Sequence, residues 1–202
     1  MSTTTTVTGP PEGRAVLPPG RVPYRLSVER YEAMVEAGFF TEADRLELIE
    51  GMLVEKMTKG NEHRLAVQLA FHAIRAALPP GWHATKEDPI RLPARQSEPE
   101  PDVAVVRGAI RDYAAGPPGP GDVALVIDIA ASSVASDRAL AATYLSGGIP
   151  EYWVLNIQSS CLEVYRPGEP VRVVAATESA DLVLDGQVVA QIAVAELLPR
   201  RP

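Results

Sequence analysis

The chain contains very little cysteine and very little lysine. A single cysteine, Cys161, occurs in 202 residues, which excludes an internal disulfide and a zinc site built on cysteines. The three histidines do not form a metal-binding pattern. Lysine occurs only at Lys56, Lys59 and Lys86, so arginine carries most of the positive charge. Few residues are therefore available for any role that requires a lysine.

The chain also lacks excess positive charge and long apolar runs. Its net charge of -7 argues against a protein that coats nucleic acid by bulk charge, although local basic clusters could still bind DNA. No apolar run is long enough to cross a membrane, and the polar N-terminus lacks the apolar stretch of a signal peptide. We therefore expect a cytoplasmic protein with no membrane partner.

The length and composition predict one globular domain after a polar arm. Residues 1–23 are rich in threonine, proline and glycine and offer little apolar surface to offset the entropy of ordering, so we expect a disordered arm. Residues 24–202 have the apolar content of a single domain with a substantial core. No internal repeat and no second domain is evident.

The hydrophobic periods alternate between those of helices and those of strands, which predicts an α/β (α+β) fold. Ser27 is a suitable N-cap for a helix in VERYEAMVEAG, and RLELIEGMLVEKM predicts a hairpin that turns at Glu50-Gly51. Further helices are expected from Gly60 to Leu78 and from Ala135 to Ser146. The predicted strands are ATKEDPIRL, DVAVV, VALVIDIAA, EYWVLN, CLEVYR, VRVVAA and a pair around Asp185-Gly186, before a short last helix. Pro89 limits the first of these to an edge strand or a bulge.

Asp128 lies inside VALVIDIAA, which predicts a central strand buried on both faces. A buried carboxylate is unfavourable unless it is paired or bound to a cation. The alternative is that Asp128 lies near the end of the strand and contacts solvent or an arginine.

Asp102 follows Pro101 at the start of another short strand, where it could equally be a solvated turn residue. Two strands joined by a hairpin connection could bring Asp102 and Asp128 to one point. Together with the backbone carbonyl of Ile129, two carboxylates suit a hard cation such as Mg²⁺, or Mn²⁺ in its place. Such an ion can activate water and stabilise the charge that develops on a phosphodiester.

Three further residues are candidates for the same site. Glu47, on the first hairpin strand, could supply a third carboxylate, although an outward-facing polar residue fits the alternation equally well. His63, in the first turn of a helix, and Arg138 could contact a nucleic acid, although both residue types are commonly solvated at such positions. Tyr144, Tyr152 and Trp153 are interpreted as packing residues.

An ordered series of segments resembles the Uma-two family of restriction endonucleases, a branch of the PD-(D/E)XK nuclease superfamily. The segments are YEAMVEAGFFTEADRLELIEGMLVEKM, NEH, EPDVAVV, LVIDIAASS, YLSGGIPEYWVL and LEVYRPG, and they run from about Leu26 to the C-terminus. The resemblance implies a restriction-endonuclease-like core, in which helices flank a central mixed sheet, and a homodimer that cleaves DNA. It matches Asp102 to the first acid of the motif, Asp128 to the second acid, Glu47 to an acid of the hairpin and His63 to a recurrent histidine.

The sequence departs from this pattern at the lysine that the superfamily places two residues after the second acid. Ala130 occupies that position, and Leu140 or Ala141 occupies the place to which the family often moves the lysine. We therefore consider Lys86, on the strand before Asp102, and Arg138 as replacement cations.

Two hypotheses about function follow from these residues. The first is a magnesium-dependent DNA endonuclease that uses Asp102, Asp128, Glu47 and Lys86. The alternative is a catalytically degenerate protein of the same fold that acts as a binding or assembly module. A small-molecule hydrolase has no support, because the chain has neither a GxSxG elbow nor a cysteine–histidine arrangement.

Overall fold

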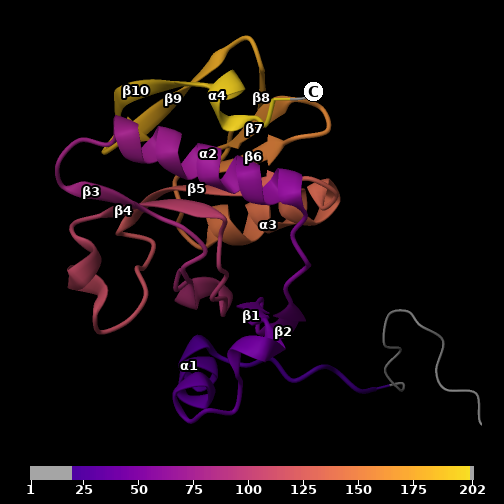
Figure 1. The fold of residues 1–202 in the computed structure, drawn as a ribbon. Helices are drawn as coiled ribbons and strands as arrows, with labels where there is room; N and C mark the ends of the chain where they lie inside the picture. The colour runs from indigo at the N-terminus through magenta and orange to yellow at the C-terminus, as the bar shows by residue number, and fades with distance from the viewer. Residues whose placement is uncertain (1–19, 201–202) are drawn as a thin grey trace, which may run out of the picture.

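A mixed six-stranded sheet forms the centre of the computed structural model, which describes residues 20–200 except for the side chain of Glu42 (Figure 1). In spatial order its strands are β3 (Trp82–Thr85), β4 (Val103–Arg107), β5 (Val123–Ala130), β6 (Tyr152–Asn156), β7 (Cys161–Tyr165) and β8 (Arg172–Ala175). Neighbouring strands are antiparallel except for β5 and β6. These two parallel strands are joined by the helix α3 (Val134–Ser146), because a parallel pair needs a crossover connection.

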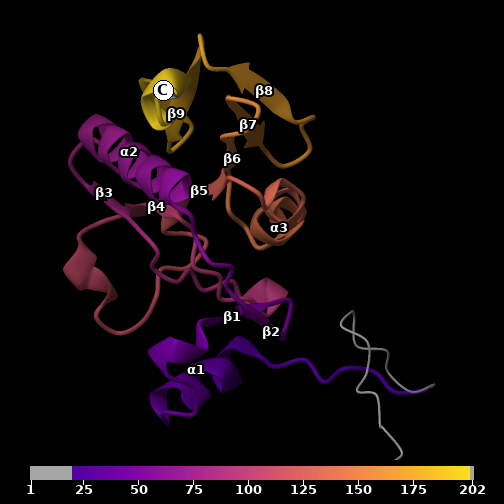
Figure 2. The same cartoon turned by 45° about the vertical axis from the view of Figure 1, so that its right-hand side comes forward.

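The two faces of the sheet are covered by different elements (Figure 2). The long helix α2 (Asn61–Ala77), the hairpin of β9 (Ser179–Leu184) and β10 (Gln187–Ala193), and the short helix α4 (Val194–Leu197) pack on one face. Helix α3 packs on the other face.

The side chains of β5 alternate between these two layers, as the period of a strand requires. Leu125, Ile127 and Ile129 join the core beneath α2, whereas Val126 and Ala130 join the core beneath α3. All eight residues of β5 are buried, which confirms the prediction of a central strand covered on both faces. Asp128 shares the parity of Val126 and Ala130 and therefore points to the α3 side.

The N-terminal elements form a smaller unit beside the sheet (Figure 1). Helix α1 (Val28–Glu36) begins after Ser27, whose side chain accepts a hydrogen bond from the backbone N–H of Arg30 and so acts as the predicted N-cap. Strands β1 (Leu46–Ile49) and β2 (Met52–Glu55) form the predicted hairpin. Short 3-10 helices occur at Glu42–Asp44, Pro93–Arg95 and Ile110–Tyr113.

The turn of the β1–β2 hairpin is fastened to the rest of the molecule by Glu50. Its side chain accepts hydrogen bonds from Thr143 of α3 at 2.8 Å and from Arg95 at 2.9 Å. Its backbone N–H donates to the hydroxyl of Ser97 at 2.7 Å. The backbone of Glu98 adds a bond to the carbonyl of Leu48. These contacts fix the hairpin beside the ends of β4 and β5.

Most predicted elements are confirmed within residues 20–200, but of the strand predicted over Ala84–Leu92 only Ala84 and Thr85 are in a strand, at the edge of the sheet. The strand is β3, and it ends at Thr85. Glu87 has a φ of 55°, which turns the chain, and Pro89 cannot donate to a ladder. Most of the predicted disordered arm, residues 1–19, lies outside the described residues. Within the described part of the chain, no helix combines the length and the apolar character that crossing a bilayer requires.

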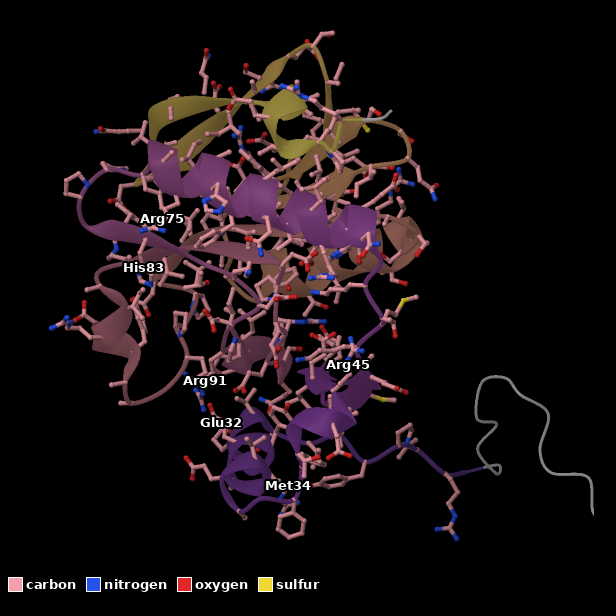
Figure 3. All side chains as sticks on the ribbon, in the orientation of Figure 1. Glu32, Met34, Arg45, Arg75, His83 and Arg91 are labelled. Atoms are coloured by element: carbon pink, nitrogen blue, oxygen red, sulfur yellow. The ribbon has the colours of Figure 1, made fainter. Side chains whose placement is uncertain are left out.

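Helix α1 is held against the body of the molecule by a cluster of acids around one arginine. Arg91 Nε donates to Glu32 Oε1 at 2.7 Å, and its Nη2 donates to Glu29 Oε1 at 2.8 Å (Figure 3). Beneath them, Glu98 is buried. Burial, and then the charge of Glu32, raise the pKa of Glu98 to about 7. Glu98 therefore takes up a proton more readily in the folded chain than in the unfolded chain.

We expect Glu98→Gln to stabilise the fold at pH 8 more than at pH 5. A carboxyl whose pKa is raised on folding contributes stability below its ordinary pKa near 4.5, and this contribution is lost as the pH rises through about 7. Glutamine keeps a donor toward Glu32 and does not ionise. Melting temperatures at both pH values test this, with Glu36→Gln, at an exposed acid at the end of α1, as the control. An equal shift at the two pH values would contradict the assignment.

Candidate functional site

Asp102 and Asp128 meet at the point where β4 and β5 pair. Asp102 immediately precedes β4, and the antiparallel register sets Val103 opposite Ile127. The backbone N–H of Asp102 donates to Asp128 Oδ1 at 3.1 Å, and the N–H of Ile129 donates to Asp102 Oδ2 at 2.7 Å. Only 5% of Asp102 and 8% of Asp128 is exposed. The two acids therefore converge, as the hairpin connection leads one to expect.

Asp102 is balanced by two side chains, one from the segment before α2 and one from its first turn. Lys59 Nζ lies 2.6 Å from Asp102 Oδ1 and 2.9 Å from Glu87 Oε1, and His63 Nε2 lies 3.1 Å from Asp102 Oδ2. Burial acts to raise the pKa of Asp102, but the hydrogen bond from His63 and the charge of Lys59 together lower it. Asp102 is thus held as an anion in a largely buried position.

Asp128 has a different environment, because no cation contacts it directly within the described part of the chain. Its Oδ2 accepts a hydrogen bond from the hydroxyl of Tyr152 at 2.8 Å, and the same hydroxyl lies 3.0 Å from the backbone carbonyl of Asp137. Burial, and then the charge of Asp102, raise the pKa of Asp128 well above its usual range. Burial also raises the pKa of Asp137 to about 6. The cluster therefore holds more carboxylates than its neighbouring cations neutralise.

A cavity of about 470 Å³ opens over these acids. Its wall includes Glu47, Lys59, Asp137 and Tyr144 in addition to the two aspartates. The hydroxyl of Tyr144 is buried and has no hydrogen-bond partner among residues 20–200, and the same holds for Nδ1 of His63. Polar atoms of this kind are uncommon in folded proteins and are often explained by a ligand or water.

The structure brings together some of the predicted site residues and separates others. Glu47 lines the cavity and accepts a hydrogen bond from the backbone of Glu100 at 3.1 Å, and burial raises its pKa. Lys86 instead lines a neighbouring hollow whose wall includes neither aspartate. Lys59, rather than Lys86, contacts Asp102, and the role of Lys86 as a replacement cation stays a prediction.

Arg138 is also engaged elsewhere. Its guanidinium donates to both carboxylate oxygens of the buried Glu163, at 2.8 Å and 2.6 Å. It therefore neutralises an acid of β7, and its expected contact with nucleic acid stays a prediction.

Sequence reasoning missed four contributors to the site: Lys59, Asp137, Tyr144 and Tyr152. The scarcity of lysine was the available signal for Lys59, since two of the three lysines, Lys56 and Lys59, lie in the short segment before α2. The tyrosines were interpreted as packing residues, and their rings do stack at 4.8 Å. Their hydroxyls, however, lie among the acids.

The ligands that the site offers suit a small hard cation better than a metal ion whose coordination sphere is made entirely of protein side chains. Within the described part of the chain, no group of three or more histidine, cysteine or acidic side chains is arranged to hold a metal ion. Mg²⁺, however, is often held by one or two carboxylates, with waters and substrate phosphates as the remaining ligands. Asp102 and Asp128 fit that smaller set, and a cation there would offset the burial and the repulsion by Asp102 that raise the pKa of Asp128.

A mixed sheet between helices, with acids meeting on two adjacent strands, defines the class as a restriction-endonuclease-like nuclease fold. The chain belongs to the Uma2 family, whose model carries the description "Putative restriction endonuclease" and matches residues 28–195. The fold is similar to the crystal structure of a protein from Anabaena variabilis described as a putative nuclease belonging to DUF820, with a TM-score of 0.62 and 15% identity. That match covers 85% of this chain and 97% of the other. No curated protein matches the chain.

We expect Asp128→Asn to raise the melting temperature, and to do so more at pH 8 than at pH 5. The variant removes a buried carboxylate whose pKa is raised, so its benefit grows as the wild-type group ionises. Asparagine can still accept from the Asp102 N–H and can donate to the hydroxyl of Tyr152. Glu196→Gln, at an exposed acid of α4, serves as the control. A lower melting temperature at pH 8 would show that the carboxylate has a structural role.

Proposed function

We propose that this chain is an endonuclease that hydrolyses DNA phosphodiester bonds with the help of a divalent cation, Mg²⁺ or Mn²⁺. The observation that carries the proposal is the meeting of Asp102, Asp128 and Lys59 in one cavity. The aspartates are linked by a hydrogen bond of 3.1 Å, and the lysine lies 2.6 Å from Asp102. Two acids and a lysine are the groups that the family resemblance implies for this chemistry.

Asp102 and Asp128 would hold the cation between them. When bound, it supplies Lewis-acid chemistry, which means charge neutralisation at the phosphodiester and activation of water. The side chain of Tyr152 keeps Asp128 oriented toward the cavity, and the N–H of Ile129 does the same for Asp102. Both carboxylates are thus positioned before any ligand arrives, which lowers the cost of reorganisation.

Lys59 is the residue that we assign to the role of the missing motif lysine. The superfamily position is occupied by Ala130, which is fully buried and apolar. Lys59 reaches Asp102, one acid of the pair, from the segment before α2. Its side chain is 28% exposed, so its ammonium can turn from Asp102 to a phosphate that enters the cavity. There it would stabilise the negative charge that develops as water attacks.

Glu47 and Tyr144 are positioned to handle protons in the same cavity. Glu47 has a raised pKa, which suits a carboxylate that accepts a proton from the attacking water. The free hydroxyl of Tyr144 can donate a hydrogen bond to a substrate oxygen or to that water. Both assignments follow from the position of these side chains on the cavity wall.

The second candidate is a binding or assembly module that has lost hydrolysis. This candidate is favoured because both carboxylate oxygens of Asp102 already have partners. They contact Lys59, His63 and the N–H of Ile129. A cation could bind Asp102 Oδ1 only if Lys59 moves away. Catalysis therefore depends on whether this lysine exchanges between carboxylate and phosphate.

We expect the purified full chain to cleave plasmid or single-stranded DNA with Mg²⁺ or Mn²⁺, and to lose cleavage in EDTA. Asp102→Asn should reduce the rate by at least about 100-fold, because it removes a carboxylate from the cation site without changing its size. Gel assays and a melting curve for each variant measure this. If folded wild-type protein leaves both substrates intact with either metal, the binding-module hypothesis replaces the nuclease.

Lys59→Met should lower kcat by roughly 100- to 1,000-fold, the effect of deleting one preorganised donor at a developing charge. Lys59→Arg should recover part of the rate, because it restores the positive charge but not the shape. The matched variant is Lys86→Met, which removes one of the other two lysines. If Lys86→Met caused the larger loss of kcat, the assignment of Lys59 would be wrong.

A further inference from the structure

A second hollow, of about 620 Å³, adjoins the acidic cavity. One wall is the first two turns of α2, which present Asn61, Arg64 and Gln68 at helical spacing. The lining also includes Lys86 and Glu87, directly after β3, and Arg45, directly before β1. Thr58, Lys59 and His63 line both spaces, so the hollow is continuous with the cavity.

The two spaces carry opposite charge. The hollow is lined by four cations, Arg45, Lys59, Arg64 and Lys86, against the single carboxylate of Glu87. The cavity is lined by two cations against six carboxylates: Glu47, Glu55, Glu100, Asp102, Asp128 and Asp137. Of the three lysines in the chain, two lie in the hollow and the third, Lys56, lines the cavity.

The cations of the hollow are also less neutralised than many arginines elsewhere. Arg64 and Lys86 have no acidic partner among residues 20–200, and Arg45 donates to a neutral acceptor, the carbonyl of Met57. By contrast, five arginines outside the hollow each pair with a carboxylate: Arg91, Arg95, Arg107, Arg138 and Arg166. The positive charges of Arg45, Arg64 and Lys86 are therefore not neutralised by a carboxylate of the described residues, and their electrostatic attraction is available to a ligand.

We propose that this hollow binds the backbone phosphates of DNA next to the phosphate that enters the acidic cavity. The assignment rests on the proposed nuclease function, which supplies the substrate, and it adds the surface that holds that substrate. Arg45, Arg64 and Lys86 contact the flanking phosphates. Lys59, at the boundary, faces both spaces and links the bound strand to the reacting phosphate.

The physical reason for such a surface is the repulsion that the rest of the molecule exerts on DNA. The chain has a net charge of -7, and its reactive cavity is acidic before a cation binds. A polyanion would be repelled from both. Phosphate contacts supply most sequence-independent affinity, and each one releases counterions from the nucleic acid. A local cluster of unpaired cations is thus the means by which an acidic protein can retain DNA at this position.

The test uses fluorescence anisotropy of labelled single-stranded and duplex oligonucleotides with the full chain in EDTA, so that binding is measured without cleavage. The variant Arg64→Gln/Lys86→Gln removes the two unpaired cations and leaves the structural bond of Arg45 intact. The matched control, Arg75→Gln/Arg172→Gln, removes the same charge. Arg75 is exposed on α2 three turns beyond Arg64, and Arg172 is exposed on β8, the edge strand opposite β3. Melting curves confirm that both variants are folded.

We expect the slope of log K against log salt to fall by about 1.8 for duplex and about 1.4 for single strands in Arg64→Gln/Lys86→Gln, since each phosphate contact contributes about 0.9 or 0.7. The control should keep the wild-type slope. An equal decrease in both variants, or none in either, would overturn the proposal. Wild-type protein that binds DNA through the hollow but never cleaves it would refute the nuclease alone. Cleavage with an unchanged KM in the hollow variant would refute the hollow alone.

Discussion

The antiparallel pairing of β4 with β5 is the constraint on which the site depends. It places Asp102, directly before β4, beside Asp128 of β5, so that the backbone N–H of Asp102 donates to the carboxylate of Asp128. Both side chains are buried there, so neither acid is well solvated. Two carboxylates so close repel each other, and burial strengthens the repulsion. The neighbouring groups offset this unequally: Lys59 and His63 serve Asp102, whereas Asp128 has only the Tyr152 hydroxyl and a backbone N–H. The asymmetry leaves a local deficit of positive charge, which a bound cation would fill.

The position of Lys59 depends in turn on contacts far from the acids. This lysine lies on the segment between the β1–β2 hairpin and α2, so the hairpin sets where the segment starts. Glu50 fastens the hairpin to Thr143 of α3 and to Arg95, and the backbone of Glu98 pairs with that of Leu48. The N-terminal unit therefore helps to fix the position of Lys59. The side chains that it contributes to the cavity wall come from the hairpin strands and the segment that follows them.

Most helices, strands and turns could be predicted from the sequence, because each depends mainly on residues that are close together in the chain. Ser27 caps α1, the apolar run at residues 123–130 is the central strand, and Glu50-Gly51 is a turn with positive φ at both residues. The failures need information that no local pattern carries. Lys59 meets Asp102 across 43 residues, and Tyr152 reaches Asp128 only because β5 and β6 are parallel neighbours. The strand predicted over Ala84–Leu92 ends early, at Thr85, because the chain turns at Glu87.

Net charge by itself is a weak argument against DNA binding, and the reason lies in how the charges are arranged. A chain of net charge -7 has little long-range attraction for DNA, which argues against a nuclease if charge is only summed. Salt screens charges beyond about 8–10 Å, however, so a phosphate in contact with the surface responds mainly to nearby groups. Near the site, acids and bases are sorted into two connected spaces rather than mixed. With the proposed function, this separation would let one small region attract a cation and the adjacent region attract a polyanion, which a uniform surface of either sign could not do.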